Sequence, residues 1–233
     1  MLQRDVMPNT GDDFIAPVCF EQIEILFQDE HILLVNKPSG LLSLSGKHPL
    51  NKDSVHYRLT KDFETATLAH RLDFGTSGIM VVALNKSVNA HITKQFQQRT
   101  VKKTYTAILQ GHIANDNGTI TIPLIKDVDR FPYQKVCYTT GKQAVTDYVV
   151  LERCSSPLST RVLFLPQTGR THQLRVHSRE IGHSILGCDL YGSQMSGQSS
   201  HDMAERLLLH ATTIAFTHPV TGQEIVGDSP CPF

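Results

Sequence analysis

The sequence lacks the features that mark secreted, membrane-spanning or zinc-binding proteins. Its five cysteines are odd in number and include no C-x-x-C pair, which argues against a disulfide framework and a zinc site. No apolar run is long enough to span a membrane, and the first residues do not show the basic-then-apolar pattern of a secretion signal. We therefore expect a cytoplasmic protein with reduced thiols, no bound metal and no membrane anchor.

The chain also has no net charge, but its charges are unevenly distributed. Residues 1–30 hold one basic residue and seven acidic residues, so the rest of the chain carries a net charge of +6. Within that remainder, basic residues cluster in two places: Lys94, Arg99, Lys102 and Lys103, and then Arg170, Arg175 and Arg179. Such clusters can contact phosphates, but solvated helix faces have the same composition. Charge alone favours the solvated helix face.

The organisation of the chain predicts one domain after a short leader. Residues 1–22 are polar and form no periodic apolar pattern, so we expect an acidic, flexible leader there. Residues 23–233 contain no linker-like stretch and are numerous enough to bury a core. We expect them to form a single domain.

Short runs rich in branched residues predict many strands and few helices. Predicted strands cover residues 24–27, 31–37, 78–86, 101–109, 144–151 and 161–165. A helix is predicted from a cap at Ser87, a second from 169–171 to Glu180 with Gly182 closing it, and a helical turn in 204–211. Asn117-Gly118 indicates a hairpin turn. Because strands and helices do not alternate regularly, the expected class is α+β with a large, mostly antiparallel sheet.

Three motif-like segments fail on spacing. Gly40 to Lys47 has five residues between its glycines instead of the four of a phosphate-binding loop. In Gly75 to Gly78 the second glycine follows Ser77 directly, whereas a nucleophile elbow places it two positions later. His172 and His177 are five residues apart, so on a helix they point about 140° away from each other and cannot form a zinc pair.

Residues 70–78, His-Arg-Leu-Asp-Phe-Gly-Thr-Ser-Gly, gather a base, a cation and a carboxylate in one predicted loop. By itself, Asp73 in such a loop is better explained by capping of a turn than by catalysis. The segment nevertheless resembles the H-R-L-D-x-x-T-S-G signature of the RluA family of pseudouridine synthases. Other motifs of that family follow the same order along the chain: 36–41 (NKPSGL), 103–105 (KTY), 169–177 (GRTHQLRVH), 182–187 (GHSILG) and 209–211 (LHA).

The resemblance spans about residues 24–228 and implies a cofactor-free enzyme with the pseudouridine synthase fold. It is greatest to a short family member that acts on both 23S ribosomal RNA and the anticodon stem-loop of transfer RNA. Many relatives carry an N-terminal S4 RNA-binding domain, but here the motifs begin early in the chain, so we expect no S4 domain. The expected partner is structured RNA, and we expect a monomer. One departure is that Cys188 stands where an acidic residue is usual, with Asp189 following it.

The resemblance also suggests roles for individual residues. It implies that Asp73 is the essential carboxylate, that Tyr105 stacks on uracil and assists proton removal, and that Arg170 holds Asp73 charged and oriented. It implies that Arg71 fills the space left by the flipped base. Further RNA contacts are expected from four basic residues: His70, Lys102, Lys103 and Arg175. From the residues alone, Arg170 could be a surface arginine, Tyr105 a core aromatic, and the other cations parts of a solvated face.

Two other functions stay open at this stage. A catalytically idle RNA-binding factor with the same fold would bind RNA without isomerising it. A hydrolase using Ser77 or a carboxylate pair would need a group that activates water. Intact Asp73, Tyr105 and Arg170 favour the isomerase over both.

Overall fold

The computed structural model describes residues 14–195 and 197–233. Its centre is a ten-stranded, mixed sheet. Every strand pairing in this sheet is antiparallel except one. The expected large, mostly antiparallel sheet is therefore confirmed.

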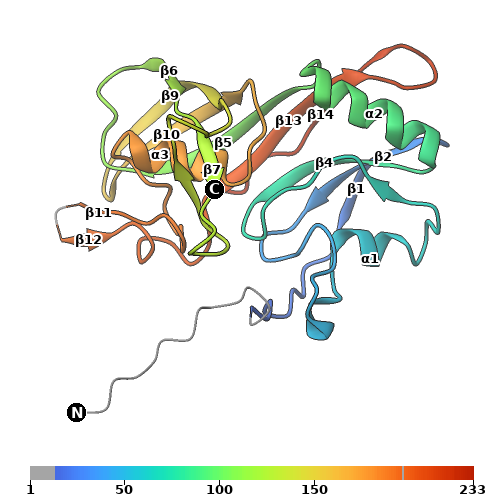
Figure 1. The fold of residues 1–233 in the computed structure, drawn as a ribbon, viewed down its shortest axis with the longest axis horizontal. Coiled ribbons are helices and arrows are strands. Elements are labelled where there is room, and N and C mark those ends of the chain that lie inside the picture. Colours follow the sequence, from blue (N-terminus) through green and yellow to red (C-terminus); the bar gives the residue numbers. More distant parts are fainter. Residues whose placement is uncertain (1–13, 196) are drawn as a thin grey trace.

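The sheet carries helices and short strands at its two ends (Figure 1). On one side lie the strands β1 (Glu24–Gln28), β2 (Ile32–Lys37), β3 (Thr67–Leu68) and β4 (Ser77–Ala83), with the helices α1 (Val55–Leu59) and α2 (Lys86–Gln98) and a 3-10 turn at Pro49–Asn51. On the other lie β6 (Asn117–Thr121), β9 (Val145–Ser155), β10 (Leu158–Pro166) and α3 (Gln173–Glu180). Between them run β5 (Lys102–Gln110) and β13 (Leu209–Thr217), and β14 (Glu224–Asp228) pairs with β13. The strand order is β1-β2-β4-β13-β5-β10-β9-β6, with β3 paired to β4. The one parallel pairing is that of β4 with β13.

Two small hairpins lie outside the main sheet. One joins β7 (Leu124–Lys126) to β8 (Gln134–Val136), and the other joins β11 (Gln194–Met195) to β12 (Gln198–Ser199). The β7–β8 hairpin packs against the loop that follows α3 through Tyr133, whose ring meets that of Tyr191 edge to face at 5.5 Å.

Hydrophobic patterning places the strands and helices where the sequence predicts most of them. All seven residues of β4 are buried, as expected for a continuous apolar run. In α2, Val88 and Ile92 are buried on one face. The helix begins two residues earlier than predicted, because the side chain of Asn85, not Ser87, accepts a hydrogen bond from the N–H of Val88.

Two sequence-based predictions about local structure are wrong. Asn117-Gly118 does not form a hairpin turn, because both residues lie in β6 and pair with β9. A Cβ on Gly118 would lie 2.8 Å from the ring of Tyr148, so this glycine provides room for an aromatic side chain. Residues 204–208 contain no helical turn; they run as irregular chain into β13. Leu207, which precedes β13, and Leu209, which begins it, are both buried. Helix α3 also starts at Gln173, later than predicted.

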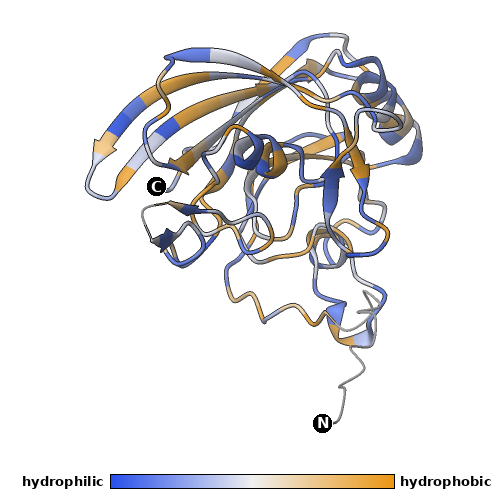
Figure 2. Cartoon of the chain, turned by 60° about the vertical axis from the view of Figure 1, so that its left-hand side comes forward, coloured by the Kyte–Doolittle hydropathy of each residue, from blue (hydrophilic) through white to orange (hydrophobic). Residues whose placement is uncertain are grey.

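The buried apolar residues form two clusters rather than one. The first gathers side chains of β2, β4, α1 and α2, and the second those of β5, β9, β10 and α3. Along some of the strands, hydrophobic stretches alternate with hydrophilic ones, as Figure 2 shows. Tyr105 in β5 packs against both clusters. The boundary between the clusters therefore passes through the middle of the sheet.

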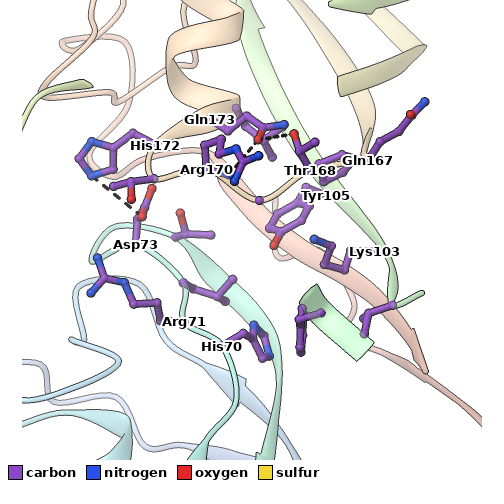
Figure 3. A pocket seen from close by; sticks show the side chains of 18 of the residues that line it. His70, Arg71, Asp73, Lys103, Tyr105, Gln167, Thr168, Arg170, His172 and Gln173 are labelled. Carbon is purple, nitrogen blue, oxygen red and sulfur yellow. Dashed lines mark hydrogen bonds and ion pairs between the residues drawn. The ribbon is translucent and has the colours of Figure 1, made fainter. Parts of the chain in front are cut away.

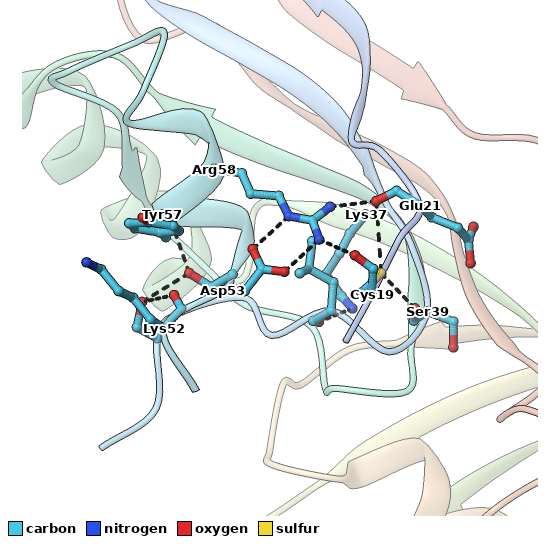
Figure 4. Close-up of polar contacts among 11 residues, drawn as sticks. Cys19, Glu21, Lys37, Ser39, Lys52, Asp53, Tyr57 and Arg58 are labelled. Atoms are coloured by element: carbon cyan, nitrogen blue, oxygen red, sulfur yellow. Dashed lines mark hydrogen bonds and ion pairs between the residues drawn. The ribbon is translucent and has the colours of Figure 1, made fainter. Parts of the chain in front are cut away.

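The part of the predicted leader that the structure describes, residues 14–22, has no helix or strand but is tied to the first cluster. Arg58 of α1 donates hydrogen bonds to the carbonyls of Cys19 and Glu21 while its Nε donates to Asp53 at 2.8 Å (Figure 4). Asn51 also accepts a hydrogen bond from the N–H of Ala16 at 2.8 Å. Residues 1–13 of the predicted leader lie outside the described part of the chain.

Among the helices in the described part of the chain, none combines the length and the apolar character needed to cross a membrane.

Substitution of Gly78 tests the closeness of β4 and β13. Its φ is +112°, and an added Cβ would lie 2.2 Å from the carbonyl oxygen of Ala211. Gly182 is the matched control, since its φ is +84° and nothing lies within 4 Å of the same position. We expect Gly182→Ala to lower the free energy of unfolding by about 1–2 kcal/mol and Gly78→Ala by about 3 kcal/mol or more, measured by urea denaturation. Equal losses would contradict the steric explanation.

Candidate active site

A cavity of about 450 Å³ opens where the two hydrophobic clusters meet. One wall comes from the loop before β4 and the start of β5, and the opposite wall from residues 166–175 at the start of α3. Of the eight residues expected at the site, seven line this cavity: His70, Arg71, Asp73, Lys103, Tyr105, Arg170 and Arg175. Lys102 is exposed on β5 and is not among the lining residues.

The loop that carries Asp73 is held in place by the buried ammonium group of Lys37. Its Nζ donates hydrogen bonds to the carbonyls of Pro38 at 2.9 Å, Leu41 at 2.7 Å and Phe74 at 3.1 Å. The side chain is fully buried, and this burial lowers the pKa of Lys37 to about 7, although the charge of Asp73 acts in the opposite direction. Lys37 therefore joins the turn after β2 to the residue that follows Asp73.

Asp73 faces the cavity with 23% of its side chain exposed. Its backbone carbonyl accepts a hydrogen bond from the N–H of Thr76, which closes the turn into β4. The nearest cationic or potentially cationic group is His172, whose Nε2 lies 4.0 Å from Oδ1 of Asp73 (Figure 3). The turn-capping alternative is not needed to explain this residue, since its carboxylate points into the cavity.

Tyr105 stands in the middle of β5, between Ala211 of β13 and Phe164 of β10. Burial, and secondarily the charge of Asp73, raises the pKa of Tyr105 well above its usual value. Its hydroxyl is therefore protonated at neutral pH and can donate a hydrogen bond, while its ring offers a face for stacking. Tyr105 is both a cavity residue and a core residue.

His70 and Lys103 form the wall below Tyr105. The His70 ring stacks on Phe96 at 4.6 Å, and its Nε2 accepts a hydrogen bond from the N–H of Val81 at 3.0 Å. Burial lowers the pKa of His70 to about 3, so the ring is neutral, as this hydrogen bond requires. Burial also lowers the pKa of Lys103, whose Nζ lies 5.8 Å from the Phe96 ring centre. His70 thus resembles a structural support more than a phosphate ligand.

Arg170 and Arg175, the two arginines of the motif at 169–177, do not make the contacts expected from the sequence. Arg170 precedes α3, and its Nε donates to the carbonyl of Gln143 at 3.0 Å rather than to Asp73. Arg175 lies on the inner face of α3, only 5% exposed, and pairs with Asp189. Burial opposes the charge of Arg175, but neighbouring groups including Asp189 and Asp73 outweigh it and raise the pKa of its guanidinium.

The local loop around the unusual Cys188 keeps its connection to the site. The Nε of Arg175 donates to Sγ of Cys188 at 3.4 Å, and the next residue, Asp189, supplies the carboxylate. Gly187 has a φ of +70°, and a Cβ there would lie 1.9 Å from the carbonyl oxygen of Arg206, so only glycine fits this turn. Arg175 is therefore held by two consecutive residues and is not available as a surface phosphate contact.

Three residues that the sequence analysis did not assign to the site contribute to it. Lys37 belongs to the motif at 36–41 and His172 to the motif at 169–177, and Tyr191 follows the motif at 182–187. The hydroxyl of Tyr191 lies 2.8 Å from Nδ1 of His172. Membership of a motif was the available signal for Lys37 and His172, but nothing in the sequence indicates that Tyr191 contacts His172.

The arrangement also bears on the hydrolase alternative. Ser77 is buried, and its Oγ lies 2.8 Å from Nδ1 of His210 while Arg206 donates to the same oxygen. Nε2 of His210 faces the carbonyl of Ser229, not a carboxylate. Within residues 14–195 and 197–233, no group of three or more His, Cys, Asp or Glu side chains forms a metal site. A buried serine that receives a hydrogen bond from arginine is unsuited to attack a substrate.

Known proteins are similar to this chain in sequence. A family model described as RNA pseudouridylate synthase matches residues 31–180. The dual-specificity RNA pseudouridine synthase RluA of Yersinia pestis is 51% identical over 198 residues, which cover 85% of this chain and 94% of that protein. The protein of the same name from Escherichia coli K12 is 46% identical over 209 residues, covering 90% of this chain and 93% of that protein.

Solved structures share the fold. Human RNA pseudouridylate synthase domain containing 1 superposes with a TM-score of 0.76 at 32% identity and covers 93% of this chain and 86% of its own. Human RNA pseudouridylate synthase domain containing 4 gives a TM-score of 0.71 at 26% identity, covering 90% and 88%. The family and fold expected from the motifs are thereby confirmed. The chain belongs to the RluA-type RNA pseudouridine synthases and is therefore an isomerase.

Proposed function

We propose that this isomerase acts on uridines in 23S ribosomal RNA and in the anticodon stem-loop of transfer RNA, with Asp73 as its essential carboxylate. The observation that carries the site assignment is the position of Asp73 in a cavity lined by four motif segments from distant parts of the chain. The choice of RNAs is supported by the likeness, at 46–51% identity, to proteins named dual-specificity RNA pseudouridine synthases.

The chemistry requires little beyond a positioned carboxylate. The bond between uracil N1 and ribose C1′ breaks, the base turns, a bond forms between C5 and C1′, C5 loses its proton and N1 gains one. No electrons or water enter or leave. In this proposal Asp73 either stabilises positive charge on the sugar, attacks it covalently or abstracts a ribose proton.

Arg175, rather than Arg170, is the cation that we assign to Asp73. Its guanidinium is buried on the inner face of α3 and interacts electrostatically with Asp73. A buried cation opposite a carboxylate favours its ionised, oriented form. The half-buried Arg170, which closes the rim of the cavity, is left for contact with the RNA backbone.

The target base must leave the RNA stack to reach Asp73, because no base can rotate inside a helix. The cavity, at about 450 Å³, has the size typical of small-molecule sites, roughly 300–1,000 Å³, and so can hold a flipped base. Tyr105 offers a ring for that base to stack on. Arg71 is exposed beside Asp73, a position from which its side chain can enter the space that the base vacates.

The same proposal covers the setting in which the enzyme works. Residues 23–233 act as one catalytic domain, because a single sheet runs through both hydrophobic clusters. RNA recognition then comes from Lys103 and Arg170, which line the cavity, and from Lys102, which is exposed on β5. We expect a monomer in the cytoplasm, in keeping with the free thiols of Cys19, Cys137, Cys154, Cys188 and Cys231.

Asp73→Asn tests the essential carboxylate because it preserves size and removes charge. We expect tritium release from RNA transcripts labelled with [5-³H]uridine to stop in this variant, while RNA binding continues. Wild-type protein on transfer RNA and 23S ribosomal RNA transcripts is the control, and mapping of pseudouridine then gives the sites. Substantial turnover by Asp73→Asn would contradict the assignment.

The two arginines form a matched pair for a second test. We expect Arg175→Met to lower kcat by about 10²-fold or more, because Asp73 loses its buried cation, with little change in KM. Arg170→Met should instead raise KM and leave kcat within about 3-fold of wild type. Single-turnover rates on a transfer RNA stem-loop distinguish the two patterns. The reverse pattern would restore Arg170 as the partner of Asp73.

Tyr105→Phe separates the ring from the hydroxyl. The ring face is retained, so we expect the Kd for RNA to change by less than about 2-fold. Loss of the hydroxyl should lower kcat by about 10²-fold if it takes part in the movement of the C5 proton. A variant with wild-type kcat would limit Tyr105 to stacking.

A further inference from the structure

His172 adopts a backbone conformation that is unusual for its residue type. Its φ of 53° and ψ of 20° place it in the left-handed region, which only one other non-glycine residue, Arg99, shares among the described residues. Such a conformation costs about 1 kcal/mol or more, although histidine tolerates it better than most residues. It turns the His172 ring from the start of α3 toward the cavity, where Nε2 faces the carboxylate of Asp73 (Figure 3).

A chain of hydrogen bonds determines which ring nitrogen of His172 carries the proton. The backbone N–H of Gln134, in β8, donates to the hydroxyl oxygen of Tyr191 at 2.7 Å. The same hydroxyl lies 2.8 Å from Nδ1 of His172. In the described part of the chain this hydroxyl contacts two polar groups, and one of them, the N–H of Gln134, can only donate, so the hydroxyl proton of Tyr191 has Nδ1 of His172 as its acceptor. Nδ1 is then unprotonated, and the ring proton is on Nε2, the nitrogen that faces Asp73.

The surroundings keep both rings in these forms. Burial raises the pKa of Tyr191 to about 12, so its hydroxyl retains the proton that it donates. Burial also lowers the pKa of His172, and the positive charges of Arg175 and Arg71 act in the same direction, while Asp73 and Asp189 oppose them. A neutral His172 with its proton on Nε2 is the result. Its side chain is 11% exposed, so water competes little for that proton.

We propose that His172 is a positioning residue for Asp73, and that Tyr191, anchored by the β7–β8 hairpin, fixes the tautomer in which Nε2–H donates to the carboxylate. The distance of 4.0 Å is longer than a hydrogen bond, so the contact shortens when RNA fills the cavity. A neutral donor orients the carboxylate without neutralising its charge, a function that the cationic Arg175 does not duplicate. This inference rests on the proposed role of Asp73.

The tautomer can be measured without RNA. In protein labelled with ¹⁵N-histidine, long-range ¹H–¹⁵N spectra should show His172, assigned by comparison with His172→Gln, protonated on Nε2 and bare on Nδ1 near neutral pH. Tyr191→Phe keeps the buried ring and removes the hydroxyl, so the resonances of His172 should move toward a mixture of the two tautomers. A proton on Nδ1 in the wild-type protein would overturn the proposal, whatever RNA the enzyme modifies.

Turnover tests the effect on Asp73, with His172→Leu and His172→Gln as a matched pair at the same backbone conformation. His172→Leu should lower kcat about 10- to 100-fold, the value of a hydrogen bond to a charged group, with KM within about 2-fold of wild type. His172→Gln, whose amide can donate from near the position of Nε2, should recover most of that loss. Equal defects in Leu and Gln would reduce His172 to a packing role.

A double-mutant cycle connects Tyr191 to the same role. Tyr191→Phe should lower kcat by itself, and the His172→Leu, Tyr191→Phe double variant should be no slower than His172→Leu, because Tyr191 acts through His172. Losses that multiply would show that Tyr191 acts by another route. If wild-type protein fails to modify either RNA, the proposed substrates are wrong. The ¹⁵N spectra do not depend on RNA and still decide the tautomer of His172.

Discussion

The position of Asp73 depends on one buried lysine side chain. Lys37 places three hydrogen bonds on the carbonyls of Pro38, Leu41 and Phe74, and so connects the turn after β2 with the loop that carries Asp73. A lysine without exposure to water is costly unless its donors are satisfied, and here every donor of the ammonium group has an acceptor. The hydrogen bonds of Lys37 therefore hold the loop from which Asp73 faces the cavity.

Opposite that loop, the start of α3 is organised by side chains that are neutral rather than charged. Gln173 accepts hydrogen bonds from the N–H of Arg170 and the hydroxyl of Thr168, and its amide donates to Val145 and Thr146 of β9 (Figure 3). The buried cation, Arg175, comes one half-turn later on the same helix. The cavity thus has Asp73 beside one hydrophobic cluster and Arg175 beside the other, and the sheet connects the two clusters.

The sequence predicts much of this fold because its strands carry strong patterns. The β1–β2 hairpin, the fully buried β4 and the helix with Val88 and Ile92 follow from hydrophobic periodicity. Asn117-Gly118 misled because a glycine that makes room for a neighbouring ring looks the same as one that makes a turn. Residues 204–208 misled because Ala, Glu, Arg and Leu all have high helix propensity.

At the site, the motifs identify which residues gather but not how they point. Asp73 and Tyr105 lie in the cavity as expected. The roles of Arg170 and Arg175 could not be separated by sequence, since the choice depends on where α3 begins and which of its faces is buried. The left-handed backbone of His172 and the reach of Tyr191 depend on tertiary contacts that no local pattern encodes.

The position of β13 in the sheet also has a consequence for how the enzyme is made. This strand is inserted between β4 and β5, and its pairing partners on the β4 side, such as Ser77 and His210, are 133 residues apart along the chain. Contacts this distant close a large loop and form slowly compared with local ones. During synthesis, Asp73 and Arg175 both emerge before β13 can join their two halves of the molecule. The nascent chain therefore becomes a competent enzyme only when its last long strand has left the ribosome and docked.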